Sequence, residues 1–188
     1  ALLSKTGCEM HVANMCGGDL GSFTLSRSEI RKVRTAECVK AAKMIGADFR
    51  VGGADDFEID YTHENRIKAA RVFRDIDPDV VFTLPPQDYH RDHEEVSKLA
   101  RFACFASGVP HYVTGNKPST KQVPYLYYWD PIDLKQYFGN LAPCQFYIDI
   151  TSVMDLKIEM LECHASQMKW LQGHHKINMF VKMVVDNS

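Results

Sequence analysis

Residues 80 to 93 read Val80-Val81-Phe82-Thr83-Leu84-Pro85-Pro86-Gln87-Asp88-Tyr89-His90-Arg91-Asp92-His93. The first five residues form an apolar run of the kind that a buried parallel strand uses, and a helix is expected to begin near Glu94. In open α/β sheets, ligands bind at the carboxyl ends of the strands, where helix N-termini point into a crevice. The sequence therefore predicts that His90 and His93 lie just beyond a strand, at an edge where chemistry takes place.

The two histidines are three residues apart and Asp92 lies between them. This arrangement suits one metal ligand, one acid–base group and a carboxylate that fixes the tautomer of a ring. The same residues also suit a polar loop with surface histidines, in which Asp92 caps the following helix. The motif alone leaves both interpretations open.

Composition and charge exclude several classes of protein. The chain has 188 residues and 21.4 kDa, with 45% hydrophobic and 24% charged residues and a formal net charge of -2. It is long enough for one domain with its own core. This net charge does not predict a positively charged surface that would bind nucleic acid or an anionic membrane. No apolar stretch approaches membrane-spanning length. Six cysteines without a Cys-x-x-Cys pair indicate reduced, buried thiols of a cytoplasmic protein.

Predicted strands and helices alternate along the chain. Residues 2–7 resemble the end of a helix that Gly7 terminates in a left-handed conformation. Strands are expected at 9–15, 49–53, 80–84, 123–129 and 145–150, with a further short one at 111–113, and helices at 26–46, 62–76, 94–108 and 151–171. This order predicts an α/β fold, namely a Rossmann-like three-layer α/β/α sandwich with a mostly parallel sheet.

Several local motifs also follow one another in a known order. They are Cys16-Gly17-Gly18-Asp19-Leu20-Gly21, Arg34-Thr35-Ala36-Glu37, Asp56-Phe57, His90-Arg91-Asp92-His93 and Cys163-His164-Ala165-Ser166-Gln167. In this order the chain resembles the LmbE-like, or PIG-L, family of zinc-dependent N-acetylglucosaminyl deacetylases, from about Ala1 to Leu171. The resemblance implies a single domain over residues 1–188, one bound Zn²⁺, and hydrolysis of the N-acetyl group of an amino-sugar conjugate.

The resemblance also implies roles for individual residues. His93 would be a zinc ligand, His90 would stabilise the oxyanion or protonate the leaving amine, and Asp92 would orient a histidine ring. Substrate contacts would come from Arg34, Asp56, Asp19 and Tyr89. For each of these four a structural role stays open: an exposed helix arginine, a turn aspartate, a loop cap and a packed aromatic ring. His164 is expected to pack beneath the site.

One departure from the family pattern is large. The opening Ala-His-Pro-Asp-Asp motif supplies two zinc ligands and the general base in that family, and this sequence lacks it. Its place would be before Ala1, on a central strand, so we expect the chain to be truncated at both ends and its sheet to be interrupted beside residues 80–84. We also expect these 188 residues alone to bind zinc weakly and to release no acetate.

Three classes of function therefore remain. The first is a zinc amidase that acts on a small amino-sugar conjugate, with no nucleic-acid or membrane partner and with homo-oligomer formation left open. The second is a non-catalytic protein that binds a sugar or nucleotide sugar. The third is a different metal-dependent hydrolase, such as a phosphoesterase, since paired histidines and aspartates also serve two-metal sites.

Overall fold

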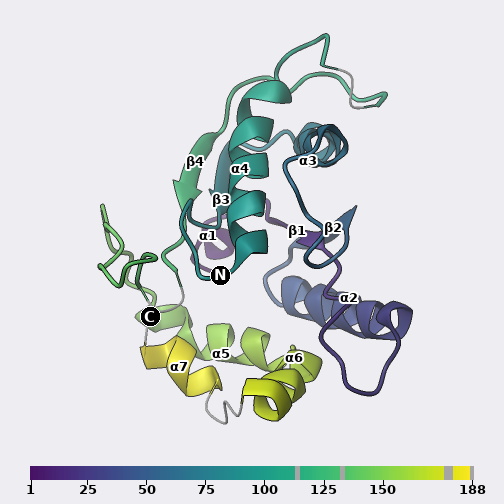
Figure 1. The fold of residues 1–188 in the computed structure, drawn as a ribbon. Coiled ribbons are helices and arrows are strands. Elements are labelled where there is room, and N and C mark those ends of the chain that lie inside the picture. Colours follow the sequence, from purple (N-terminus) through teal and green to yellow (C-terminus); the bar gives the residue numbers. More distant parts are fainter. Residues whose placement is uncertain (113–114, 132–133, 176–179, 187–188) are drawn as a thin grey trace. The chain divides into compact units, whose positions relative to one another are not determined.

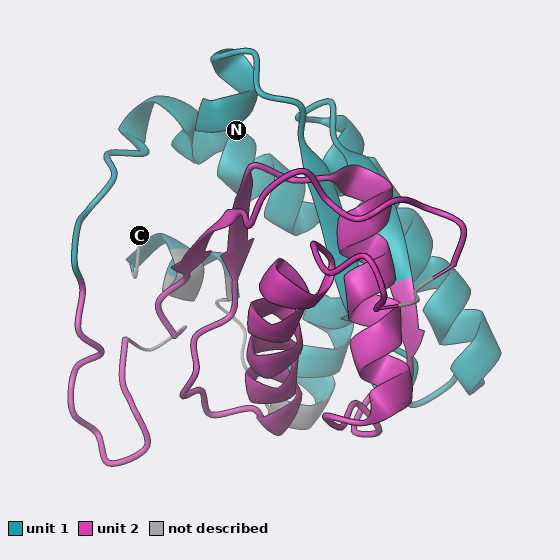
Figure 2. Cartoon of the chain, turned by 90° about the horizontal axis from the view of Figure 1, so that it is seen from above, with its two compact units in different colours: residues 1–51, 145–188 teal, residues 52–144 magenta. Residues whose placement is uncertain are grey.

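The computed structural model describes residues 1–112, 115–131, 134–175 and 180–186. The chain divides into two compact units, which Figure 2 distinguishes by colour. Unit 1 comprises Ala1–Val51 and Gln145–Ser188, and unit 2 comprises Gly52–Cys144. Unit 1 thus combines segments from both ends of the sequence. The expectation of one domain over residues 1–188 stays a prediction.

Unit 1 contains strands β1 and β2 together with the first two helices and the C-terminal helices. Its elements are α1 (Leu2–Lys5), β1 (His11–Cys16), α2 (Arg27–Lys43), β2 (Asp48–Ala54, whose last residues enter unit 2), the 3-10 turn η1 (Thr151–Val153), α5 (Met154–Glu162), α6 (Ala165–Trp170), the π-turn η2 (Leu171–His175) and α7 (Phe180–Asp186). β1 and β2 pair in a two-stranded sheet, and α2 packs against α5 and α6.

Unit 2 is a two-stranded parallel sheet with two helices. Its elements are α3 (His63–Ile76), β3 (Val80–Thr83), α4 (Arg91–Ala106) and β4 (Tyr125–Tyr128). β3 pairs in parallel with β4, with Val80 opposite Tyr125 and Thr83 opposite Tyr128. Helix α4 lies along β3 and packs against α3, as Figure 1 shows. The loop from β3 to α4 therefore starts at the carboxyl end of a parallel strand, as predicted.

Small side chains allow α3 and α4 to approach closely. Ala70, Leu99 and Ala103 are fully buried, and Ala69 and Cys104 are nearly so. Small residues let helix backbones come close enough for dense packing, because little side-chain volume separates them. The close packing gives the N-terminus of α4, and the histidines beside it, a rigid support.

Several predicted elements are confirmed. The helix predicted from residue 26 begins with a capping box, in which the side chain of Ser26 accepts from Glu29 N and the carboxylate of Glu29 accepts from Ser26 N. Thr62 caps α3, and Gly7 has the left-handed φ of 88° expected of a helix terminator. These signals are local, and so the sequence was sufficient to locate them.

Other expectations were wrong. Residues 145–150 form no strand, and residues 110–112 form a turn and a bend, while Val113 lies outside the described residues. The single helix expected at 151–171 is divided into η1, α5 and α6. Among the cysteines, only Cys104 and Cys163 are buried, whereas Cys8 and Cys144 are exposed.

The strands of the described residues form two two-stranded sheets, β1–β2 and β3–β4. In the described residues β3 pairs with β4 alone, and the expected interruption of the sheet beside residues 80–84 stays a prediction. In the same residues, every helix is too short or too polar to cross a bilayer.

Candidate functional site

The loop that enters α4 carries a group of polar side chains that we call the histidine cluster: Asp88, Tyr89, His90, Asp92 and His93. The rings of His90 and His93 stack with centroids 4.9 Å apart and planes inclined by 28°. The ring of Tyr89 meets both edge-on, at 5.9 Å and 5.6 Å between centroids. The structure therefore brings the two predicted histidines and Tyr89 together.

A buried carboxylate fixes the ring of His93. Nδ1 of His93 lies 2.9 Å from Oδ1 of Asp88, whose side chain is 3% exposed. A carboxylate can only accept, so Nδ1 of His93 carries the proton and Nε2 carries the lone pair. An imidazole with its second nitrogen tied to a carboxylate is the usual arrangement of a metal-binding histidine. No signal in the sequence singled out Asp88, although it lies five residues before His93.

His90 is held in the opposite tautomer. It is the N-cap residue of α4, and its Nδ1 accepts from the backbone N–H of Asp92 at 3.2 Å. Because Nδ1 accepts this bond, the neutral ring carries its proton on Nε2. The two stacked imidazoles therefore present different groups: Nε2–H from His90 and an Nε2 lone pair from His93.

The structure corrects the expected part of Asp92. It is not the N-cap of α4, and the backbone of Asp92, not its carboxylate, contacts the ring of His90. The carboxylate Oδ2 instead accepts from the backbone N–H of Phe57 at 2.9 Å. Oδ1 is buried and has no hydrogen-bond partner among the described residues. Asp92 therefore joins the start of α4 to the loop that follows β2.

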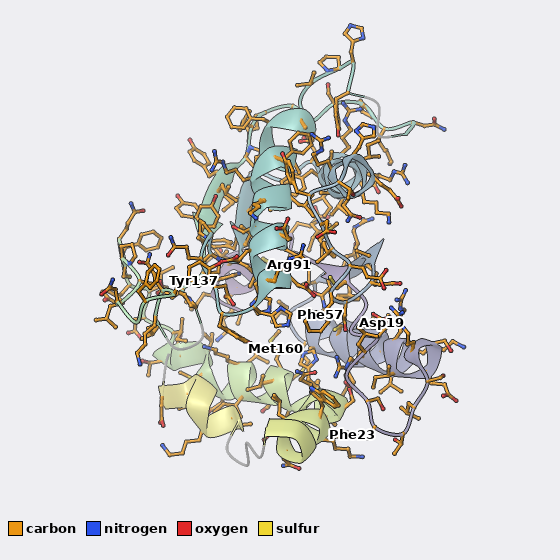
Figure 3. All side chains as sticks on the ribbon, viewed as in Figure 1. Asp19, Phe23, Phe57, Arg91, Tyr137 and Met160 are labelled. Carbon is orange, nitrogen blue, oxygen red and sulfur yellow. The ribbon has the colours of Figure 1, made fainter. Side chains whose placement is uncertain are left out.

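This contact brings the loop containing Asp56 to the histidine cluster. Phe57 follows Asp56 and has a left-handed backbone, with φ of 61°, and its ring centroid lies 5.2 Å from that of His90. Figure 3 labels Phe57 near the start of α4. Its neighbour Asp56 is half-buried in the same loop. These contacts belong to Phe57, and the convergence of Asp56 itself with the histidines stays a prediction.

Asp19 lies in unit 1, in the glycine-rich loop before α2. Its side chain is fully buried, and Oδ2 receives Arg27 Nε at 2.6 Å and lies 3.1 Å from Arg31 Nη2. Asp19 therefore fixes two arginines of α2 to this loop (Figure 3 labels Asp19). Its role toward a substrate, and its convergence with the histidine cluster of unit 2, remain predictions.

Arg34 contributes to a pocket within unit 1. The pocket has a volume of about 210 Å³, and Arg34, Glu37, His164 and Gln167 line it together with residues of β1 and β2. Arg34 Nη2 donates to the carbonyl of Gly21 at 2.9 Å. A Cβ at Gly18 or Gly21 would come within 2.6 Å or 2.5 Å of the Arg34 side chain. The glycine-rich loop is therefore required here for the close approach of an arginine.

Glu37 of α2 connects this pocket to the start of α6. Its two carboxylate oxygens accept from Ser166 N at 2.8 Å and from Ser166 Oγ at 2.6 Å. In one continuous helix, Ser166 N–H would bond to a carbonyl one turn earlier. Glu37 takes this donor instead, and the helix expected at 151–171 is divided at Cys163 and His164. His164, which we expected to pack beneath the site, lines this pocket.

Burial lowers the pKa of His164 below its usual value, an effect that the carboxylate of Glu37 opposes and the guanidinium of Arg34 reinforces. The neutral ring is therefore the favoured form near pH 7. In the same pocket, burial together with the nearby Glu37 raises the pKa of the Cys38 thiol. A raised pKa makes a reactive thiolate scarce, so Cys38 is a poor nucleophile.

The histidine cluster offers one candidate metal ligand among the described residues. His93 fits as one ligand, since Asp88 leaves its Nε2 lone pair available. Across the described part of the chain, no three His, Cys, Asp or Glu side chains gather so as to hold a metal ion. Catalytic zinc sites use three protein ligands, and His93 as one of them stays a prediction.

Comparisons with known proteins place this geometry in a family. The profile of the family "PIG-L: GlcNAc-PI de-N-acetylase" matches residues 1–104, and the chain belongs to this family. The match includes β1, the glycine-rich loop, α2 and the histidine cluster. The resemblance noted in the sequence is therefore confirmed, and so is the α/β fold class.

Two characterised relatives have different activities. A 4-oxalmesaconate hydratase of Pseudomonas putida is 25% identical over 179 residues, which cover 89% of this chain and 66% of the relative. A diacetylchitobiose deacetylase of Thermococcus kodakarensis is 28% identical over 183 residues, covering 88% of this chain and 61% of the relative. The chain thus spans less than two thirds of the length of either relative.

A solved structure supports the fold. The crystal structure of GalB, the 4-carboxy-2-hydroxymuconate hydratase from Pseudomonas putida KT2440, matches with a TM-score of 0.75 and 22% identity, over 95% of this chain and 81% of GalB. Members of the family are hydrolytic enzymes or hydratases and are generally metal-dependent. The fold and family are thereby established, and the reaction belongs to the proposal that follows.

Proposed function

We propose that the full-length protein is a zinc-dependent N-deacetylase, which adds water to the carbonyl carbon of an N-acetyl group on an amino-sugar conjugate. The observation that carries this proposal is the pair of stacked imidazoles held in opposite tautomers by Asp88 and by the backbone of Asp92. The similarity to a diacetylchitobiose deacetylase supports the choice of substrate class.

The two rings suit the two demands of amide hydrolysis. Attack of water on the amide carbon places negative charge on the carbonyl oxygen, and later the amine must gain a proton before it leaves. The Nε2–H of His90 is a donor for that oxygen, and the leaving amine would take the proton that the general base removes from the water. The Nε2 lone pair of His93 is the ligand atom for the metal.

Zinc, when bound, would lower the pKa of a water molecule and polarise the carbonyl. Several other contributions can be assigned to residues of this chain. Asp88 orients His93, Asp92 ties the loop after β2 to α4 through Phe57, and Tyr89 packs against both rings. Arg34, Asp56, Asp19 and Tyr89 are proposed to contact the substrate, and the general base is not assigned.

Hydration is the second candidate. The hydratase relative is similar to this chain over nearly the same length as the deacetylase. In both reactions the addition of water places negative charge on a carbonyl oxygen of the substrate. One histidine that donates to this oxygen and one that binds a metal ion therefore suit either reaction. The substrates differ, since a hydratase of this kind takes an unsaturated carboxylate in place of an N-acetylated sugar. A sugar-binding protein without catalysis, or a phosphoesterase, would release no acetate and hydrate no alkene.

The test uses the full-length gene product loaded with zinc. Acetate release from N,N'-diacetylchitobiose is measured in parallel with hydration of 4-oxalmesaconate, which consumes a conjugated double bond and lowers its ultraviolet absorbance. We expect acetate release, and a loss of about 100-fold or more in kcat for His90→Gln, because removal of one donor to the oxyanion costs about 10²–10³-fold in kcat. His63→Gln, an exposed histidine of α3, is the control and should keep full activity.

The competing outcomes are distinct. Hydration without acetate release would replace the deacetylase by the hydratase. Neither activity, with tight binding of the sugar, would support the non-catalytic alternative.

We further propose a cytoplasmic location and a small-molecule partner. Because the described residues supply one oriented imidazole, we expect the 188 residues alone to bind zinc weakly.

A further inference from the structure

We propose that Asp88 is a positioning residue: it holds the imidazole of His93 in the Nδ1–H tautomer and so keeps the Nε2 lone pair outward. The consequence for metal binding rests on the proposed function, whereas the tautomer itself does not. No motif in the sequence indicates a role for Asp88. The inference rests on the contacts of its side chain.

One carboxylate oxygen of Asp88 serves both histidines. Oδ1 accepts from Nδ1 of His93 at 2.9 Å and from the backbone N–H of His90 at 2.9 Å. The first bond sets the proton on the His93 ring. The second fixes the backbone of the residue that caps α4. The direction of the His93 ring is therefore tied to the start of the helix.

Asp88 is itself held in place. It is 4% exposed, and its backbone N–H donates to Oε1 of Glu94 at 3.0 Å. The hydroxyl of Tyr137 donates to the same Glu94 oxygen. A buried carboxylate is costly unless hydrogen bonds satisfy it, and here two N–H donors do so. A carboxylate kept in this way cannot rotate away from His93 without losing both bonds.

A purely structural alternative makes a different prediction. If Asp88 only stabilised the conformation of the loop before α4, its removal would change the tautomers of His90 and His93 together. If it positions His93, its removal changes the tautomer of His93 alone, because the ring of His90 is set by the backbone N–H of Asp92 at 3.2 Å. The two rings therefore report separately on the same substitution.

The experiment is long-range ¹H–¹⁵N NMR of the histidine rings of ¹⁵N-labelled protein without metal, above about pH 7.5, where unperturbed imidazoles are neutral. His90→Gln and His93→Gln assign the two rings. In the unsubstituted protein we expect the proton of His93 on Nδ1 and that of His90 on Nε2. In Asp88→Ala we expect the His93 ring to become a mixture of tautomers and His90 to stay unchanged.

Two further variants complete the design. Asp88→Asn keeps an accepting oxygen and should retain the Nδ1–H form of His93, and Asp92→Asn, the control, should leave His93 unchanged. Zinc titration of full-length Asp88→Ala should show affinity lower by about 10–100-fold, the usual effect of removing a carboxylate behind a metal-binding histidine.

The inference is overturned if His93 of the unsubstituted protein carries its proton on Nε2, a result that requires no variant to fold. It is also overturned if Asp88→Ala leaves His93 unchanged, or if both rings change together. If the tautomers follow expectation and no zinc binds, the role of Asp88 stands and the proposed function fails.

Discussion

The pocket of unit 1 places His164 beside two charged side chains, Glu37 and Arg34. Its ring is only half-buried, so solvent screens these charges in part. Burial nevertheless has the largest influence and lowers the pKa of His164. His164 was expected to pack beneath the site. In the structure its pKa reports how far the pocket excludes solvent.

This shift predicts a pH dependence of stability. The pKa of His164 is lower in the folded chain than in the unfolded one, where it is about 6.5, so the unfolded chain binds the proton more readily. The stability from a neutral His164 is present above about pH 6.5 and is lost as the pH falls below it. Thermal unfolding between about pH 8 and about pH 5 should therefore depend less on pH in His164→Gln than in the unsubstituted protein. Equal slopes, with His63→Gln as the surface control, would refute this.

Among the elements, α4 connects the histidine cluster at its start to an arginine cap at its end. Arg74 of α3 is 7% exposed and donates to the carbonyls of Ser107 at 3.0 Å, Val109 at 2.6 Å and Lys117 at 3.4 Å. These carbonyls lie at and beyond the C-terminus of α4, where the helix dipole favours a positive charge. The guanidinium therefore both satisfies the helix end and fastens α3 to α4.

Arg74→Met should lower the free energy of unfolding by about 3 kcal/mol, because hydrogen bonds from a charged donor contribute about 1.5–3 kcal/mol each and the buried carbonyls lose their partner. Arg71→Met is the matched control, an exposed arginine of the same helix, and should change stability by about 0.5 kcal/mol or less. Urea unfolding of both variants checks this. Similar losses for the two arginines would show that burial and the three carbonyls have no special effect.

At this scale the sequence predicted the elements that local signals define. The helix starts at Ser26 and Thr62 depend only on neighbouring residues, so helices beginning there were predicted. The helix α4 was expected to begin near Glu94, and its N-cap is His90, a residue type that is not among the favoured N-caps. The division of α5 from α6 depends on Glu37, which is 129 residues away from Ser166, and no local pattern contains that information.

The site shows the same limit. The His-x-Asp-His motif indicated where two neighbouring imidazoles lie, but their tautomers depend on a turn that spacing rules do not describe. Asp92 was expected to orient a ring with its carboxylate, and the backbone of Asp92 and the carboxylate of Asp88 do so instead. The strand expected at 145–150 failed because an apolar run forms a strand only where another strand can pair with it.

For the whole molecule, the bond between Glu37 and Ser166 joins the two sequence segments that make up unit 1. Glu37→Ala should lower stability by about 1–3 kcal/mol, since a buried donor loses a charged acceptor. Hydrogen exchange should become faster in α2, α5 and α6 and stay unchanged in α3 and α4. Glu64→Ala, which removes an exposed ion pair to Lys68 in unit 2, is the control. Equal acceleration in both units would contradict this account.

The proposed mechanism assigns a metal-binding nitrogen to His93 and a hydrogen-bond donor to His90. The most direct measurement is the zinc affinity of the full-length gene product, determined by competition with a chelator, in the unsubstituted protein, His93→Gln and His90→Gln. We predict that His93→Gln weakens zinc binding by more than about 100-fold, because it removes a ligand atom. Removing a residue that only hydrogen-bonds to a ligand costs about 10–100-fold. We predict that His90→Gln leaves the zinc affinity unchanged. Unchanged zinc affinity in His93→Gln, or an equal loss in His90→Gln, would contradict the assignment of the two rings.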